Sequence, residues 1–148
     1  MAADRSYIAD NAAQLDRLRA LIRRLSDQDL ARPMPAGWTI AAVLAHLAFW
    51  DQRARVLMER WAAGHAPRAF GHDDVDWIND AGKALCLALP PRAAADLCLA
   101  TAEAADRAVA ALPDDRLAAN AAAGSPVAVL RATHRREHLD EIERVLAG

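Results

Sequence analysis

Apolar residues recur at steps of three and four along most of this chain, the spacing that places them on one face of an α-helix. Pro, Gly and short polar runs interrupt that spacing and divide the chain into five stretches. No stretch alternates apolar and polar residues as a half-buried β-strand does. The pattern therefore predicts five helices, at about residues 4–25, 39–63, 73–89, 91–112 and 126–145.

Residues that favour a helix start stand at four of the expected N-termini. Hydroxyl and carboxylate side chains can accept a hydrogen bond from the first free backbone N–H groups, and proline lacks the N–H that would otherwise go unpaired. The expected starts are, in chain order, an N-cap at Thr39, one at Asp73 or Asp74, Pro91 in a first turn, and an N-cap at Ser125 before Pro126.

Size and composition predict a single all-α domain. A chain of 148 residues can bury roughly 70% of its unfolded surface without disulfides. Hydrophobic residues make up 54% of the chain and glycines number only 6, a balance that suits closely packed helices. Four principal helices and a shorter crossover helix pack most economically as a four-helix bundle. We therefore expect residues 1–148 to form one four-helix bundle with an additional short crossover helix.

Charge and hydropathy exclude two classes of partner. The net charge is −2 with both signs interspersed, so no basic surface for nucleic acid is expected. No segment approaches 18 uninterrupted apolar residues and the N-terminus has no basic leader, so we expect a cytoplasmic protein without a membrane span. Cys86 and Cys98 lie in apolar helical surroundings and are expected to be inert core residues, not a disulfide.

Three histidines carry the strongest chemical signal. His134 and His138 are four residues apart, so on a helix their rings lie on one face and can bind a single ion. His46 lies on an apolar stripe of its own in the second predicted helix. Three imidazoles meeting inside a bundle would make a site for a divalent metal, zinc or nickel above all, with an open coordination position. The other interpretation is that each histidine is a core residue with a satisfied hydrogen bond.

The run His134-Arg135-Arg136-Glu137-His138 also matches H-x-x-E-H, the inverted zinc-protease signature. That class places a third, carboxylate ligand well downstream, and this sequence ends 10 residues after His138. We therefore do not expect a protease. A supporting or surface role is expected for Glu137.

Three segments resemble the DinB-like superfamily, which includes the N-terminal domains of mycothiol-dependent maleylpyruvate isomerases and the bacillithiol transferases. These segments are W-T-I-A-A-V-L-A-H-L-A-F-W-D, D-W-I-N at 76–79, and the terminal H-R-R-E-H-L-D-E-I. The resemblance spans nearly the whole chain. It implies a four-helix bundle, often a homodimer, that binds a divalent metal through one histidine of the second helix and two residues of the last.

Those ligand positions match His46, His134 and His138. In the isomerase branch the first residue of the terminal pair is acidic, so His134 brings this chain closer to the general DinB-like pattern. Asn79 is a candidate for facing the site, and Arg53, two turns after His46, is a candidate for contacting an anionic substrate. The alternative for Arg53 is an ordinary surface position.

Two functions are compatible with this site. The first is a metal-dependent enzyme in which a low-molecular-weight thiol, held as thiolate, attacks a small electrophilic substrate and gives S-transfer or isomerisation. The second is a non-enzymatic metal-binding bundle with a stress-response or dimerisation role. The sequence favours the first function over the second.

Overall fold

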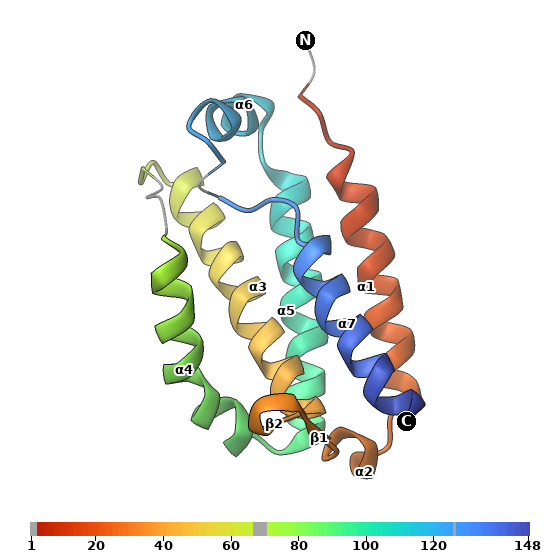
Figure 1. Cartoon of the computed structure of the whole chain (residues 1–148). Helices are drawn as coiled ribbons and strands as arrows, with labels where there is room; N and C mark the ends of the chain where they lie inside the picture. Colours follow the sequence, from red (N-terminus) through yellow and green to blue (C-terminus); the bar gives the residue numbers. More distant parts are fainter. Residues whose placement is uncertain (1–2, 67–70, 126) are drawn as a thin grey trace.

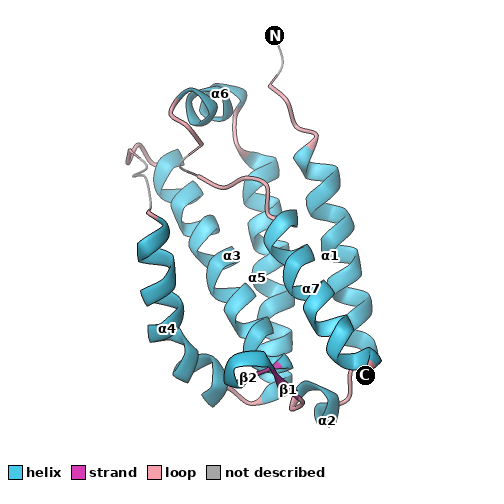
Figure 2. Cartoon of the chain, in the orientation of Figure 1, coloured by secondary structure: helices cyan, strands magenta, loops and turns pink. Residues whose placement is uncertain are grey.

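Long helices dominate the part of the chain that this computed structural model describes, residues 3–66, 71–125 and 127–148 (Figure 2). The long helices are α1 (Tyr7–Arg24), α3 (Ile40–Ala62), α4 (His72–Ala88), α5 (Pro91–Ala111) and α7 (Ala132–Ala147). The short elements are α2 (Asp27–Leu30), the 3-10 turn η1 (Pro35–Gly37), α6 (Asp114–Ala122), and the antiparallel strands β1 (Pro33–Met34) and β2 (Trp38–Thr39).

Helices α1, α3, α5 and α7 form the bundle, and α4 lies outside it against α3 (Figure 1). Helices α3 and α5 run in one direction, whereas α1 and α7 run in the other. Two consecutive bundle helices can be parallel because α4 returns the chain to the end at which α3 began. This confirms the expected all-α four-helix bundle with a crossover helix. None of the described helices is both long and apolar enough to cross a membrane.

Small side chains form the contact between α3 and α5, the most extensive contact between two helices. Ala45 and Ala48 on α3 and Ala95 and Ala102 on α5 are all buried there. Short side chains allow two helix axes to approach closely, because the interaxial distance depends on the residues at the crossing. Leucine and isoleucine side chains from α1, α3 and α7 complete the same core.

Two predicted helix starts are confirmed. The Thr39 hydroxyl accepts a hydrogen bond from the backbone N–H of Ala42 at 3.1 Å, so α3 begins where the sequence indicates. Pro91 is the first residue of α5. The segment before Thr39 was expected to be loop, but it forms the β1–β2 hairpin around η1. That hairpin brings Trp38 back beside α3 and α4.

The predicted start of the last helix is wrong. Ser125 has a left-handed backbone (φ 57°) and does not cap a helix, and α7 begins only at Ala132. Pro126 lies outside the described residues. Asn120 anchors the chain at Val127, because its side chain exchanges two hydrogen bonds with the backbone of that residue, at 2.9 and 3.0 Å. The buried Asn11 of α1 then caps α7, with its Oδ1 accepting the backbone N–H of Arg131 and of Ala132 at 2.7 and 2.9 Å.

Two further differences concern polar helix ends. Helix α4 begins at His72 with Gly71 as its N-cap, so Asp73 and Asp74 lie in its first turn instead of capping it. Carboxylates in a first turn still complement the helix dipole. Helix α6, with Asp114 and Asp115 in its first turn, occupies a stretch that was expected to be loop.

Candidate metal centre

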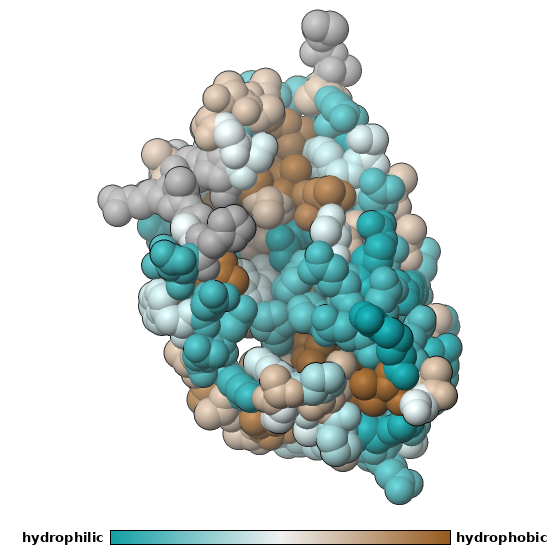
Figure 3. All heavy atoms as spheres, viewed as in Figure 1, coloured by the Kyte–Doolittle hydropathy of each residue, from teal (hydrophilic) through white to brown (hydrophobic). Residues whose placement is uncertain are grey.

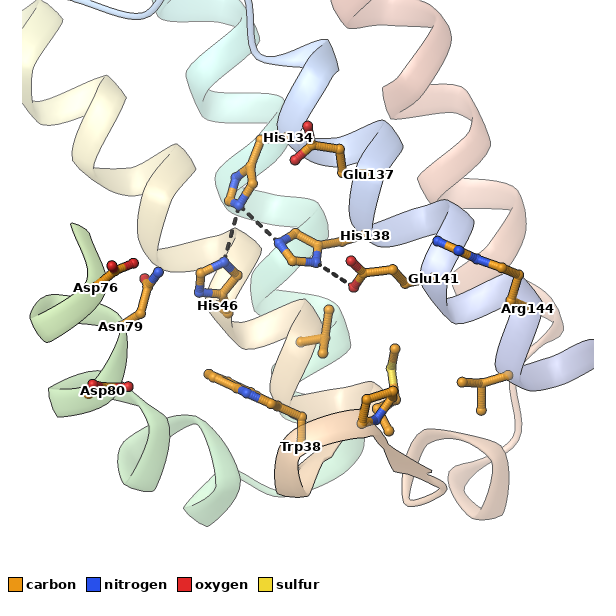
Figure 4. Close-up of a pocket in the computed structure, with 14 residues that line it drawn as sticks. Trp38, His46, Asp76, Asn79, Asp80, His134, Glu137, His138, Glu141 and Arg144 are labelled. Atoms are coloured by element: carbon orange, nitrogen blue, oxygen red, sulfur yellow. Dashed lines mark hydrogen bonds and ion pairs between the residues drawn. The ribbon is translucent and has the colours of Figure 1, made fainter. Parts of the chain in front are cut away.

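The structure brings His46, His134 and His138 together at one side of the bundle (Figure 4). His46 lies two turns into α3, and the other two lie on the first turns of α7. The Nε2 atom of His134 is 3.1 Å from Nε2 of His46 and 3.1 Å from Nε2 of His138. All three potential ligand atoms lie within 4.8 Å of one another.

These separations fit a common ion. Two imidazole nitrogens bound at about 2.0–2.1 Å to one zinc ion are roughly 3.0–3.4 Å apart, depending on the angle between the two bonds. The observed 3.1 Å distances fall in that range without any movement of the helices. The three histidines could therefore hold a divalent metal.

Two of the three rings are in the neutral form that binds metal. Burial, with a smaller contribution from the charge of His138, lowers the pKa of His46 to about 4. Burial, the charges of His138 and His46, and those of two nearby arginines lower the pKa of His134 to about 3. At neutral pH each of these two nitrogens can offer a lone pair to a cation without first losing a proton.

Glu141 orients the third ring. Its Oε2 atom is 3.1 Å from Nδ1 of His138, one helical turn away. A proton on Nδ1 donates to this carboxylate and leaves the Nε2 lone pair facing the other two histidines. Sequence reasoning did not identify Glu141. The signal was present in the spacing, since residues three apart on a helix share a face.

The histidines are only half-buried, which corrects the expectation that they lie in the middle of an apolar stripe. The buried residues of α7 include Arg135, Leu139 and Ile142, so the buried face passes beside His134 and His138 and does not include them. His134 and His138 therefore lie at the edge of the core. They face open space and not the bundle interior.

That open space is a cavity of about 930 Å³ between α4, α7 and the hairpin. In the space-filling view the surface is hollowed beside α4, and hydrophilic side chains flank much of the hollow (Figure 3). Its charged lining residues are Asp76, Asp80, Glu137, Glu141 and Arg144. Glu137 thus lies beside the histidines, at the cavity surface. An ion bound by the histidines would have a face turned toward this cavity.

Asn79 lines the cavity from α4, as the sequence suggested. Its Oδ1 accepts a hydrogen bond from the indole N–H of Trp50 at 2.8 Å, which ties α4 to α3 and leaves the amide nitrogen as the group that can donate to a bound molecule. Arg53 stacks over the same indole, 5.5 Å from the ring centroid. Arg53 is not among the described residues that line this cavity, and its contact with Trp50 links it to Asn79.

Lys83, the single lysine of the chain, joins α4 to the hairpin. The ammonium group of Lys83 on α4 donates to the carbonyl of Ala36 and lies over the Trp38 ring at 5.4 Å. Ala36 and Gly37 have left-handed backbones (φ 59° and 77°), which turns that carbonyl toward α4. Trp38 in turn meets His46 edge-on at 5.7 Å. The hairpin, α4 and the histidines therefore form one connected structure.

A buried ionic network lies behind the histidines. Asp51 of α3 is 1% exposed and accepts hydrogen bonds from Nε of Arg131 at 2.8 Å and Nε of Arg135 at 3.2 Å. Arg135 also forms a bidentate pair with Asp106 of α5, at 2.8 and 3.0 Å. Burial lowers the pKa of Arg135, but the two carboxylates more than offset it and raise that pKa overall. The arginine is charged, and its charge is compensated.

The described structure thus combines a four-helix bundle and a crossover helix with three histidines that converge from α3 and α7. The family model for the mycothiol maleylpyruvate isomerase N-terminal domain matches residues 12–143, and the chain belongs to this family within the DinB-like superfamily. The three histidines favour the general DinB-like pattern over the isomerase branch, but the family model assigns the chain to the isomerase N-terminal domain family. Comparisons with curated proteins and with solved structures found no match.

Replacing Asp51 by Asn should destabilise the protein strongly. The substitution keeps the shape of the side chain but leaves two buried arginines short of a counter-charge, a loss of roughly 3–5 kcal/mol in the free energy of unfolding. Urea unfolding monitored by circular dichroism measures it. Asp140→Asn is the matched control, because Asp140 is 52% exposed in its pair with Arg17 and such a surface pair contributes about 0–1 kcal/mol. Equal losses for the two variants would contradict the role given to the network.

The metal-free protein should lose stability as the pH falls. A histidine in the unfolded chain takes up a proton near pH 6.5, whereas folded His46 and His134 do so only near their pKa values of about 4 and about 3. Between these limits the unfolded state binds more protons, so acid favours unfolding. Urea midpoints of chelator-treated protein at about pH 7.5 and about pH 5 test this. The double variant His46→Gln, His134→Gln should show a smaller shift between the two pH values than the exposed control His65→Gln, and an unchanged shift would refute the assignment.

Proposed function

We propose that this protein is a metal-dependent enzyme that uses a low-molecular-weight thiol as co-substrate and either joins the thiol through its sulfur to a small electrophile or uses the thiol to isomerise that electrophile. The observation that carries the proposal is the convergence of three imidazole Nε2 atoms beside a large cavity. Three protein ligands and an accessible side are the arrangement of catalytic metal sites, whereas structural sites are closed. The name of the matched family, which contains mycothiol, supports a thiol as the second reactant.

The donor set suits zinc or nickel, since imidazole is a good ligand for both. A bound divalent ion would supply one property, the stabilisation of a thiol as its thiolate at neutral pH. The chain supplies the rest. Glu141 keeps the His138 ring in the orientation that presents Nε2, and the Asn79 amide nitrogen can donate a hydrogen bond to a molecule in the cavity.

The cysteines of the chain itself are poor nucleophiles. Cys98 is completely buried, and burial raises the pKa of its thiol far above the usual range. Burial also raises the pKa of the half-buried Cys86. A thiol with a raised pKa has little thiolate at neutral pH. We therefore propose that the nucleophile is an external thiol and not a cysteine of the chain.

The purified protein should bind about one equivalent of zinc or nickel through the three histidines. His46→Ala and His138→Ala should each reduce the bound metal to trace levels, because two imidazoles remain where three are needed. Elemental analysis after dialysis against each metal measures this. His65→Ala, on an exposed loop position, should retain the metal. Metal content that is low in the parent protein and unaffected by the histidine changes would remove the metal site.

The metal-loaded protein should accelerate the reaction of a cellular thiol with monochlorobimane, in which a carbon–sulfur bond forms and chloride leaves with the bonding electron pair. Fluorescence with a panel of thiols, including mycothiol, follows the product. Removing the metal or replacing His138 should abolish the acceleration, since both remove the source of thiolate. Stoichiometric metal with no metal-dependent turnover for any thiol would favour the non-enzymatic metal-binding bundle.

A further inference from the structure

A second cavity, of about 650 Å³, adjoins the metal centre. It lies along α4, on the side that faces α3 and the start of α5, and we call it the apolar groove. Its lining includes Phe49 on α3, Trp77 and Leu85 on α4, and Leu97 on α5. The apolar groove and the first cavity share Trp38, His46 and Asn79. A molecule in the groove can therefore reach the same histidine that faces the first cavity.

The two cavities differ sharply in charge. Four carboxylates and one guanidinium line the first cavity. No Asp, Glu, Lys or Arg is among the described residues that line the apolar groove, although 26% of the chain is charged. One side of the metal centre thus suits polar groups, and the other suits uncharged ones.

The size and supports of the groove suit a small molecule. Ligand pockets commonly enclose about 300–1,000 Å³ and are lined by apolar and aromatic side chains with a few polar groups. The Trp50–Asn79 hydrogen bond and the contact of Lys83 with Ala36 fix α4 at two places along it. Phe49 is 48% exposed and Trp77 60% exposed, so large aromatic surfaces stand uncovered at its edge. Exposed apolar surface of this kind typically marks a binding site.

We propose that the apolar groove binds the electrophilic co-substrate, and that this electrophile is an uncharged, largely apolar molecule. This inference rests on the proposed function, because the bound molecule is a reactant only if the protein is a thiol-dependent enzyme. The thiol would occupy the polar cavity, and its sulfur would meet the electrophilic carbon beside His46 and Asn79. With an aryl chloride as the electrophile, a carbon–sulfur bond forms, the carbon–chlorine bond breaks, and chloride leaves with its electron pair.

The same geometry disfavours a dicarboxylate electrophile such as maleylpyruvate. In the apolar groove its carboxylates would lose hydration without gaining a charged partner. In the first cavity they would meet Asp76, Asp80, Glu137 and Glu141 with only Arg144 as a compensating cation. The charge of the cavity linings therefore argues against maleylpyruvate, the compound in the name of the family, as a substrate of this protein.

Binding of N-phenylnaphthylamine, a neutral fluorescent probe, to the metal-free protein tests the groove independently of catalysis. We expect saturable binding that Phe49→Glu weakens about tenfold or more, because a carboxylate in the groove must be desolvated or excludes the probe. Val56→Glu is the matched control, since Val56 is 38% exposed two turns further along α3 and lines neither cavity. Ala81→Trp, which fills the groove without adding charge, should weaken binding as well.

Turnover then tests the charge of the electrophile, with N-acetylcysteine amide as the thiol and metal-loaded protein. Chlorodinitrobenzene should react with a higher kcat/KM than its anionic analogue chlorodinitrobenzoate, relative to their uncatalysed rates. Phe49→Glu should raise KM for chlorodinitrobenzene, whereas Val56→Glu should not. If neither compound turns over but the probe still binds as described, the proposed function fails and the groove remains a site for uncharged apolar ligands.

Three results would overturn the proposal. The first is that Phe49→Glu and Val56→Glu weaken binding of the probe equally, which would show that the probe does not bind in the apolar groove. The second is a preference for the anionic electrophile. The third concerns the oligomeric state: the parent protein is dimeric by analytical ultracentrifugation and does not bind the probe, and Phe49→Glu converts it to a monomer whereas Val56→Glu does not. That result would assign the groove to an interface between two copies of the chain.

Discussion

The buried carboxylate of Asp51 is the constraint on which the rest of the structure depends. It lies on α3 and binds both arginines at the start of α7, and Arg135 continues the network to Asp106 on α5. A buried ion pair is tolerated only when its geometry is nearly ideal and its remaining hydrogen bonds are made. Asn11 of α1 completes the set by capping α7. One polar cluster therefore joins all four helices of the bundle and allows a single rotation and register for α7.

That register brings the three histidines together. With Arg135 turned inward, its neighbour His134 and then His138 fall at the edge of the core, beside His46 on α3. Their half-buried position has two effects. Burial lowers the pKa of His134 and keeps the ring neutral, and the charges of the other histidines and the two arginines add to this. At the same time the Nε2 atoms remain next to a cavity, so a bound molecule can approach them.

Local signals were sufficient for the fold, because apolar spacing, Thr39 and Pro91 act within one helix. The spacing of His134 and His138 also placed these two rings together, and the structure brings His46 beside them. The errors arose where distant residues decide the outcome. Asn11 and Asn120 set the start of α7 from other helices, so Ser125 could not reveal it. An arginine in a periodic pattern normally indicates an exposed position. Arg135 can be buried because Asp51 and Asp106 compensate its charge. The expected homodimer and cytoplasmic location stay predictions, as do the roles of the histidines as ligands.

The crossover helix α4 has a consequence beyond topology. It packs against α3 and the hairpin from outside the bundle, and it borders both cavities that His46 lines, with Asp76 and Asp80 at the first and Trp77 and Leu85 at the apolar groove. The histidines lie on α3 and α7, whereas α4 lines both cavities and supplies two of the five charged side chains of the first. The core does not depend on most of the α4 side chains, because many of them are exposed. Substitutions on α4 can therefore change the lining of both cavities while the three imidazoles, which lie on α3 and α7, keep their positions.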